Sequence, residues 1–190
     1  CLSFLRNNPR STWKILAQGA AGVPIYLTFM YSQQHLLDGG LPPLFLGAAL
    51  MALRFGGVEG MALGARVKIR LFPCVFWCAL CCAGGTFLAG SLFWPIALLG
   101  GVLAQGFDSL LDLRLDAALN EDFPSDQRAT LVSVTSMVYS LLMIVASPIS
   151  SMIGDTLGNQ WTFRALGLGL LVSTLAGGAL YRLIFRKHKP

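Results

Sequence analysis

Three aspartates, Asp108, Asp112 and Asp116, follow one another at intervals of four residues within an otherwise apolar stretch. In an α-helix this spacing places the three carboxylates on one face. A carboxylate in apolar surroundings is costly unless it faces a cavity or a partner, and it can bind cations or exchange protons. We therefore expect Asp108 and Asp112 to belong to a solute or proton pathway, and Asp116, nearer the end of the stretch, to a gate.

Two further charged residues, Arg54 and Glu59, stand in an earlier apolar stretch. Arg54 and Asp108 both fall near the middle of their stretches, so their depth makes them the natural ion pair. Such a pair is either structural or part of a solute or proton site, and an arginine that turned to a solute would change the proton affinity of the aspartate. The sequence leaves both readings open, and we place Arg54 and Glu59 in the expected pathway.

Uncharged polar side chains accompany these residues. Gln105 precedes Asp108 by three residues, so its amide is placed to add a hydrogen bond in the same cavity. Tyr31 and Gln34 share one face near the end of the first apolar stretch. They are either anchors at a membrane interface or members of the site.

The residues needed for enzyme chemistry are scarce in this sequence. His35 and His188 are the only histidines, and no H-E-x-x-H, G-x-S-x-G or phosphate-loop pattern is present. Four cysteines form the pattern C-x3-C-x2-C-C at residues 74–82, but no histidine or acid stands nearby. They are better explained as small apolar residues than as metal ligands. We expect no enzyme activity, no metal and no cofactor.

The composition places these residues in a membrane. Of the 190 residues, 55% are hydrophobic and 12% are charged, and the mean hydropathy is +0.65. Soluble domains carry about 25% charged residues, so an integral membrane protein is predicted. The net charge of +5 is divided into short clusters between apolar runs, which argues against nucleic acid as a partner. The expected partners are the lipid bilayer and a small-molecule solute.

Six apolar segments have about the 20 residues that a spanning helix needs. Their connections are short, as in bundles of antiparallel helices. We therefore predict an all-α fold, a single polytopic membrane bundle of six transmembrane helices that occupies residues 1–190. The predicted spans cover residues 13–36, 43–63, 71–90, 94–117, 129–153 and 162–184.

Basic residues are sorted between the two ends of these predicted spans. Eleven fall at the ends shared by both termini, and Arg164 alone falls at the opposite ends. Positive residues gather in cytoplasmic loops, so we predict a multi-pass protein of the cell membrane with both termini in the cytoplasm. The eleven are Arg6, Arg10, Lys14, Arg66, Lys68, Arg70, Arg128, Arg182, Arg186, Lys187 and Lys189.

The junction between the fourth and fifth predicted spans carries a motif. Residues 119–133 read LNEDFPSDQRATLVS, and L-N-x3-P-S-x-Q-R-A-T resembles the junction of the tenth and eleventh helices in major facilitator superfamily transporters. Residues 31–42, YSQQHLLDGGLP, resemble the end of the seventh helix in that family. The resemblance implies the C-terminal six-helix half of a twelve-helix transporter, present here as a fragment that begins with cysteine. The absent N-terminal half would be its partner.

The resemblance also gives the junction a mechanical meaning. Arg128 is placed to reach the end of the preceding helix and tie the two helices together. With Arg114, Asp116 and Asn120 it would form a cytoplasmic gate or hinge. One charged loop of the family is altered, because Gly64 stands where an aspartate is expected.

The function implied by the resemblance is secondary active transport of a small solute by alternating access. The sequence leaves open whether protons are coupled and whether the solute enters or leaves the cell. Apolar spans with few charges favour efflux of a drug-like solute slightly. The alternative function is that of a non-transporting membrane scaffold or receptor derived from a transporter fold.

Overall fold

The protein is represented by a computed structural model that describes residues 6, 8–125 and 127–186. This part of the chain is almost wholly helical and contains no strand, which confirms the all-α class. A short 3-10 helix, η1 (Pro43–Phe45), leads into the second long helix. The long helices are α2 (Pro9–Asp38), α3 (Leu46–Arg66), α4 (Leu71–Ala89), α5 (Trp94–Asp122), α6 (Arg128–Leu157) and α7 (Asn159–Arg186).

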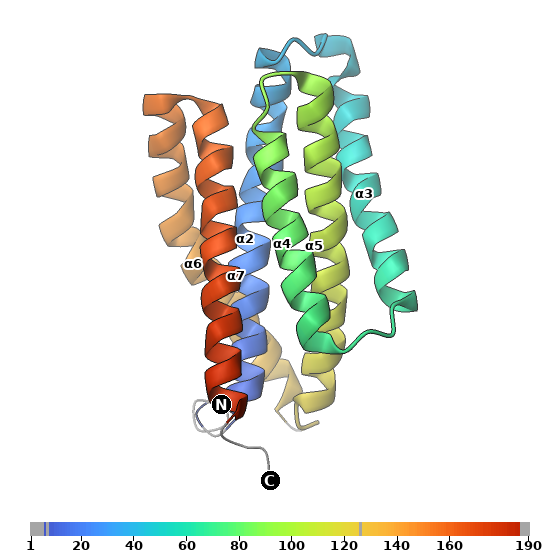
Figure 1. Cartoon of the computed structure of the whole chain (residues 1–190), viewed down its shortest axis with the longest axis vertical. Coiled ribbons are helices and arrows are strands. Elements are labelled where there is room, and N and C mark those ends of the chain that lie inside the picture. The colour runs from blue at the N-terminus through green and yellow to red at the C-terminus, as the bar shows by residue number, and fades with distance from the viewer. Residues whose placement is uncertain (1–5, 7, 126, 187–190) are drawn as a thin grey trace.

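The long helices run up and down between two ends (Figure 1). The start of α2, the loop at residues 67–70, the turn between α5 and α6 and the last turn of α7 lie at one end, which we call the terminal end. The other three connections lie at the opposite, distal end. The connections therefore alternate between the two ends in the order that the six predicted spans require. Within the bundle, α5 packs against α2, α3 and α4, while α2 also packs against α6 and α7.

Five of the helices in the described chain are long and apolar enough to cross a membrane, namely α3 with η1, α4, α5, α6 and α7. The remaining long helix, α2, is more polar, because it carries Gln18, Gln33, Gln34 and His35. It lies among α5, α6 and α7, so protein covers much of its surface and its side chains need not all be apolar. The composition therefore supports the second to sixth predicted spans. The first predicted span, residues 13–36, agrees with α2 in length and place only.

The helices differ from the predicted spans mainly in where they end, at their C-terminal residues. The fourth span was expected to end at residue 117, but α5 continues to Asp122. The Lys14 ammonium group of α2 donates a hydrogen bond to the Ala118 carbonyl oxygen at 3.0 Å. A cation is favourable at the C-terminal end of a helix, where carbonyl groups lack partners within the helix. The contact with α2 therefore favours the extra turn of α5, which is capped by the Phe123 backbone N–H at the Leu119 carbonyl oxygen.

Glycines bring α3 and α4 close to α5. A Cβ atom at Gly56 would lie 2.6 Å from the Val102 carbonyl oxygen, and one at Gly60 would collide with the Gly106 carbonyl group. On α4, a Cβ atom at Gly85 would lie 2.8 Å from a backbone nitrogen of α5. Small residues permit such close approach between membrane helices. These two contacts hold α5 between α3 and α4 and leave another face of α5 for α2.

Candidate functional site

The aspartate row of α5 is held by a residue of α2. The Gln18 amide nitrogen Nε2 donates hydrogen bonds to Asp112 Oδ1 at 2.6 Å and to Asp116 Oδ1 at 2.7 Å. One donor group between two like charges draws both carboxylates to the same point, as expected for acids on one helical face. The Gln18 oxygen Oε1 is buried and has no hydrogen-bond partner among the described residues.

Asp108 lies one turn further along the same row and is half-buried. No residue of the described chain donates a hydrogen bond to its carboxylate. Tyr139 of α6 packs against α2, where a Cβ atom at Gly22 would lie 3.4 Å from the Tyr139 ring carbon Cε2. Tyr26 stands four residues after Gly22 on the same face of α2. We call this polar area between α2, α5 and α6 the acidic site. Its members are Gln18, Tyr26, Asp108, Asp112, Asp116 and Tyr139.

Arg54 does not join the acidic site, and the predicted Arg54–Asp108 ion pair is not formed between these two described residues. The exposed Arg54 guanidinium lies over the ring of Phe29 on α2, 3.6 Å from the ring centroid. The physical reason is the packing of α3, whose face toward α5 consists largely of glycines. Arg54 is left at the edge beside α2, where an aromatic ring attracts its charge.

Glu59 and Gln105 also differ from their expected roles. Glu59 is exposed on α3 and has no hydrogen bond or ion pair with another described residue. Gln105 is buried, and its amide Nε2 donates to the Ile25 carbonyl oxygen of α2 at 3.4 Å. Gln105 therefore joins α5 to α2 and is not bonded to Asp108.

Tyr31 and Gln34 lie toward the distal end of α2. The Gln34 amide donates to Asp38 Oδ1 at 2.7 Å, and Asp38 Oδ2 accepts a 3.4 Å hydrogen bond from Asn159 at the start of α7. This position near the end of the helix agrees with the alternative in which Gln34 is an anchor at the membrane interface. Tyr31 is half-buried and packs against an apolar cluster between α2, α6 and α7, to which Tyr139 also belongs. Neither side chain contacts an acid of the acidic site in the described chain.

The expected gate residues form links at the terminal end. The Arg128 guanidinium of α6 donates to the Asn120 carbonyl oxygen at 3.1 Å, so it reaches the end of α5 as expected, through the backbone and not through an acid. The Arg114 guanidinium of α5 donates to the Ile69 carbonyl oxygen at 2.8 Å. Arg114 thus holds the loop between α3 and α4.

A further link at this end was missed by the sequence reasoning. Asp122 Oδ2 accepts hydrogen bonds from the Lys14 ammonium group and from the Ser11 hydroxyl group, both at 2.8 Å. The partners lie more than a hundred residues apart in the chain. A usable signal did exist, because Ser11, Lys14 and Gln18 recur at intervals of three and four residues and so share one face of α2.

The chain matches no protein-family model, no curated protein and no solved structure. Within the described residues, no group of three or more histidine, cysteine or acidic side chains is arranged to hold a metal ion. The chemistry of the acidic site must therefore be read from its own side chains. Carboxylates, phenols and an amide in a partly buried area can bind a cation or exchange a proton.

Proposed function

We propose that this chain is one half of a secondary transporter for a small solute, and that the acidic site belongs to its solute or proton pathway. The observation that carries the proposal is the row of Asp108, Asp112 and Asp116 within α5, a helix long and apolar enough to cross a membrane. Acids at such positions are costly, and where they occur they usually face a cavity and mark the path of an ion, a proton or a solute.

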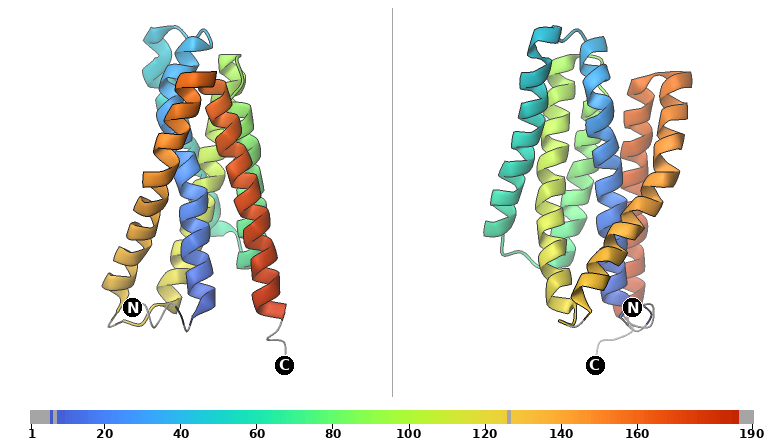
Figure 2. Two further views of the ribbon diagram at one scale, coloured as in Figure 1. Left: turned by 90° about the vertical axis from the view of Figure 1, so that its left-hand side faces the viewer. Right: turned by 180° about the vertical axis from the view of Figure 1, so that it is seen from behind.

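The incomplete cover of the acidic site supports a two-part transporter. Tyr26 and Asp116 are exposed, and α6, which is inclined against the other helices (Figure 2), buries only Leu131 and Ser150. Lipid cannot satisfy polar groups. A second helical bundle, from the same gene or from another chain, is the expected cover. Rocking of two bundles about a site between them would then expose that site to each side of the membrane in turn.

The composition of the acidic site favours a cationic solute. It joins three carboxylates to two tyrosines and an amide, and no basic residue of the described chain forms an ion pair with any of these acids. Aromatic rings and carboxylates together attract organic cations, whereas a sugar phosphate would be repelled. A drug-like cation therefore fits better than an anion.

The test is ethidium transport by the complete gene product in vesicles, with and without an imposed pH gradient. Asp108→Asn keeps the shape of the side chain and removes its charge, so we expect gradient-driven transport to fall by about tenfold or more. The matched control is Asp155→Asn, because Asp155 is exposed in the last turn of α6 at the distal end. The control should transport ethidium as the unmodified protein does.

Two results would contradict the proposal. Unchanged ethidium transport by Asp108→Asn under a pH gradient would show that the Asp108 carboxylate does not belong to the pathway. A correctly inserted gene product that moves neither ethidium nor protons would favour the scaffold or receptor alternative.

A further inference from the structure

A cavity of about 130 Å³ lies between α2, α4 and α7, away from the acidic site. Its wall includes Ala17 and Ala20 of α2, Phe76 of α4, and Gly177 and Leu180 of α7. Leu180 is exposed, so the cavity opens at the surface of the bundle. We call this cavity the apolar groove. Because α4 and α7 are both apolar enough to cross a membrane, the groove would open toward lipid.

The polar groups in the wall of the apolar groove are already paired. The Trp13 indole nitrogen donates to the Gly177 carbonyl oxygen at 3.1 Å. The hydroxyl groups of Ser173 and Thr174 both donate to the Leu170 carbonyl oxygen, at 3.0 and 2.7 Å. An occupant therefore needs no hydrogen-bonding group, which is the property of a hydrocarbon chain.

The length of the apolar groove corresponds to one leaflet of a bilayer. Its wall on α2 extends from Trp13 to Ala21, which is about 12 Å along a helix axis. Half of a hydrocarbon core of roughly 30 Å is about 15 Å. An acyl chain from the leaflet at the terminal end would fill the groove from one end to the other.

Aromatic rings mark the terminal end of the apolar groove. The Tyr181 ring lies 5.1 Å from the Trp13 ring and 4.0 Å from the Phe72 ring, measured between centroids. Tryptophan and tyrosine gather where the hydrocarbon core meets the headgroups. The headgroup of a lipid in the groove would therefore lie just beyond these rings.

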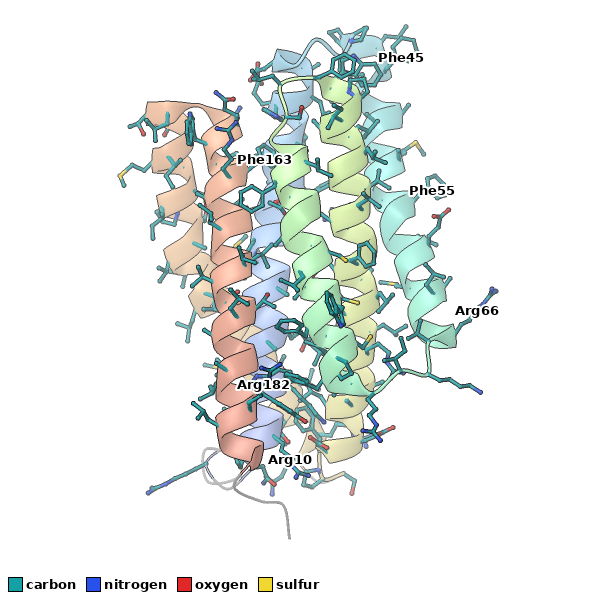
Figure 3. The ribbon with its side chains drawn as sticks, viewed as in Figure 1. Arg10, Phe45, Phe55, Arg66, Phe163 and Arg182 are labelled. Carbon is teal, nitrogen blue, oxygen red and sulfur yellow. The ribbon has the colours of Figure 1, made fainter. Side chains whose placement is uncertain are left out.

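Exposed arginines stand beyond these rings on α2 and α7 and just before the start of α4. Arg182 stands four residues after Gly178 on α7, and Arg10 stands three residues before Trp13 on α2, so both continue the faces that line the groove. Arg70 precedes the first residue of α4. Figure 3 labels Arg10 and Arg182, which both lie toward the terminal end. Arginine forms strong, directed hydrogen bonds to phosphate oxygens.

We propose that the apolar groove binds one acyl chain of an anionic phospholipid, whose phosphate group lies among Arg10, Arg70 and Arg182. The inference rests on the membrane location that is part of the proposed function. It does not depend on transport. The occupant is identified by the combination of an apolar cavity, whose polar groups are paired within the protein, with arginines toward its terminal end.

The charge of the headgroup is tested with the purified chain in a neutral detergent. Native mass spectrometry compares bound phosphatidylglycerol with bound phosphatidylcholine of the same acyl composition. One basic residue near a membrane surface contributes about a fivefold preference for anionic lipid. Arg182→Gln should therefore lower the preference for phosphatidylglycerol by about fivefold. Arg164→Gln, which alters the exposed arginine near the distal end of the same helix, should leave the preference unchanged.

The acyl chain is tested by filling the apolar groove. Ala20→Phe places a ring in the cavity and should reduce the binding of both lipids by a similar factor. Ala176→Phe is the matched control, since Ala176 is exposed on α7 outside the groove. If Ala20→Phe lowers the thermal stability of the chain, Arg182→Gln still tests the site, because its side chain is exposed.

Equal binding of the two lipids by the unmodified chain would overturn the inference, and so would unchanged binding by Ala20→Phe. Loss of ethidium transport in the complete gene product with lipid selectivity retained would contradict the proposed function alone. A chain that does not enter membranes at all would contradict both.

Discussion

Gln18 is the residue on which the geometry of the acidic site depends most directly. Its single amide nitrogen lies between the carboxylates of Asp112 and Asp116, at 2.6 and 2.7 Å. Without that donor, two like charges one turn apart on the same helix would repel each other. The bond also links α2 to α5, so one side chain both positions the acids and joins the two helices.

Replacement of this amide should be costly for folding. Gln18→Leu leaves both carboxylates without their donor, and we expect the free energy of unfolding to fall by about 1–3 kcal/mol. The measurement is reversible unfolding of the purified chain in mixed micelles. Gln33→Leu is the control on the same helix, because Gln33 is exposed and has no hydrogen bond to a described residue. An equal loss of stability in the two variants would show that the hydrogen bonds from Gln18 to the two aspartates contribute nothing specific.

The acidic row could be predicted from the sequence, whereas its partners could not. Asp108, Asp112 and Asp116 share a face because of helix geometry alone. Gln18 lies 94 residues from Asp112 in the chain, so only the packing of α2 on α5 brings the two together. Arg54 was assigned to Asp108 from depth, but depth in a bundle does not fix which neighbour a side chain faces.

Among the helices, α5 is set apart by close backbone contacts with both α3 and α4. The contact with α3 uses Gly56, Gly60 and Gly106, where any side chain would meet a carbonyl group. A shift of α3 away from α5 would also move Arg54 relative to Phe29. The placement of α3, and with it that of Arg54, therefore depends on these glycines.

Replacement of two glycines of α3 by alanine should change the free energy of unfolding in opposite directions. Gly60→Ala would drive a methyl group into the Gly106 carbonyl, and we expect a loss of about 1–3 kcal/mol in the free energy of unfolding. Gly47→Ala is the matched control, because a Cβ atom there meets nothing within 4 Å. Gly47→Ala should raise the free energy of unfolding by up to about 1 kcal/mol, because alanine lowers the conformational entropy of the unfolded chain. Equal stability of both variants would contradict the close contact between α3 and α5.

Most of each helix was predictable from apolar length and from the prolines, glycines and charges that separate the segments. The predicted starts of the second to sixth spans lie within three residues of the observed starts of η1, α4, α5, α6 and α7. The ends were less predictable, as in α5, because Lys14 of another helix binds Ala118 and Asp122 at its last turn. The polar character of α2 likewise reflects its neighbours, which shield it from the surroundings of the bundle.

The whole molecule has two different sides that share α2. Lys14 and Gln18 face α5 and its acids, whereas Ala17 and Ala20 line the apolar groove toward α4 and α7. The bundle also has two different ends, since most of the basic residues that the structure describes gather at the terminal end, whereas Arg54 lies midway along α3 and Arg164 lies near the distal end. A solute path on one side and lipid contacts on the other both require that these ends lie on opposite sides of a membrane.

This orientation can be tested in intact cells with a membrane-impermeant maleimide. In the complete gene product with its other cysteines replaced, Leu44→Cys places a thiol at the distal end and Lys68→Cys places one at the terminal end, both at exposed positions. Positive loops stay in the cytoplasm, so we expect Leu44→Cys to react in intact cells and Lys68→Cys to react only after permeabilisation. Reaction of both variants after permeabilisation is the control for accessibility. The reverse pattern would invert the orientation, and reaction of both variants in intact cells would mean that α3 does not cross the membrane.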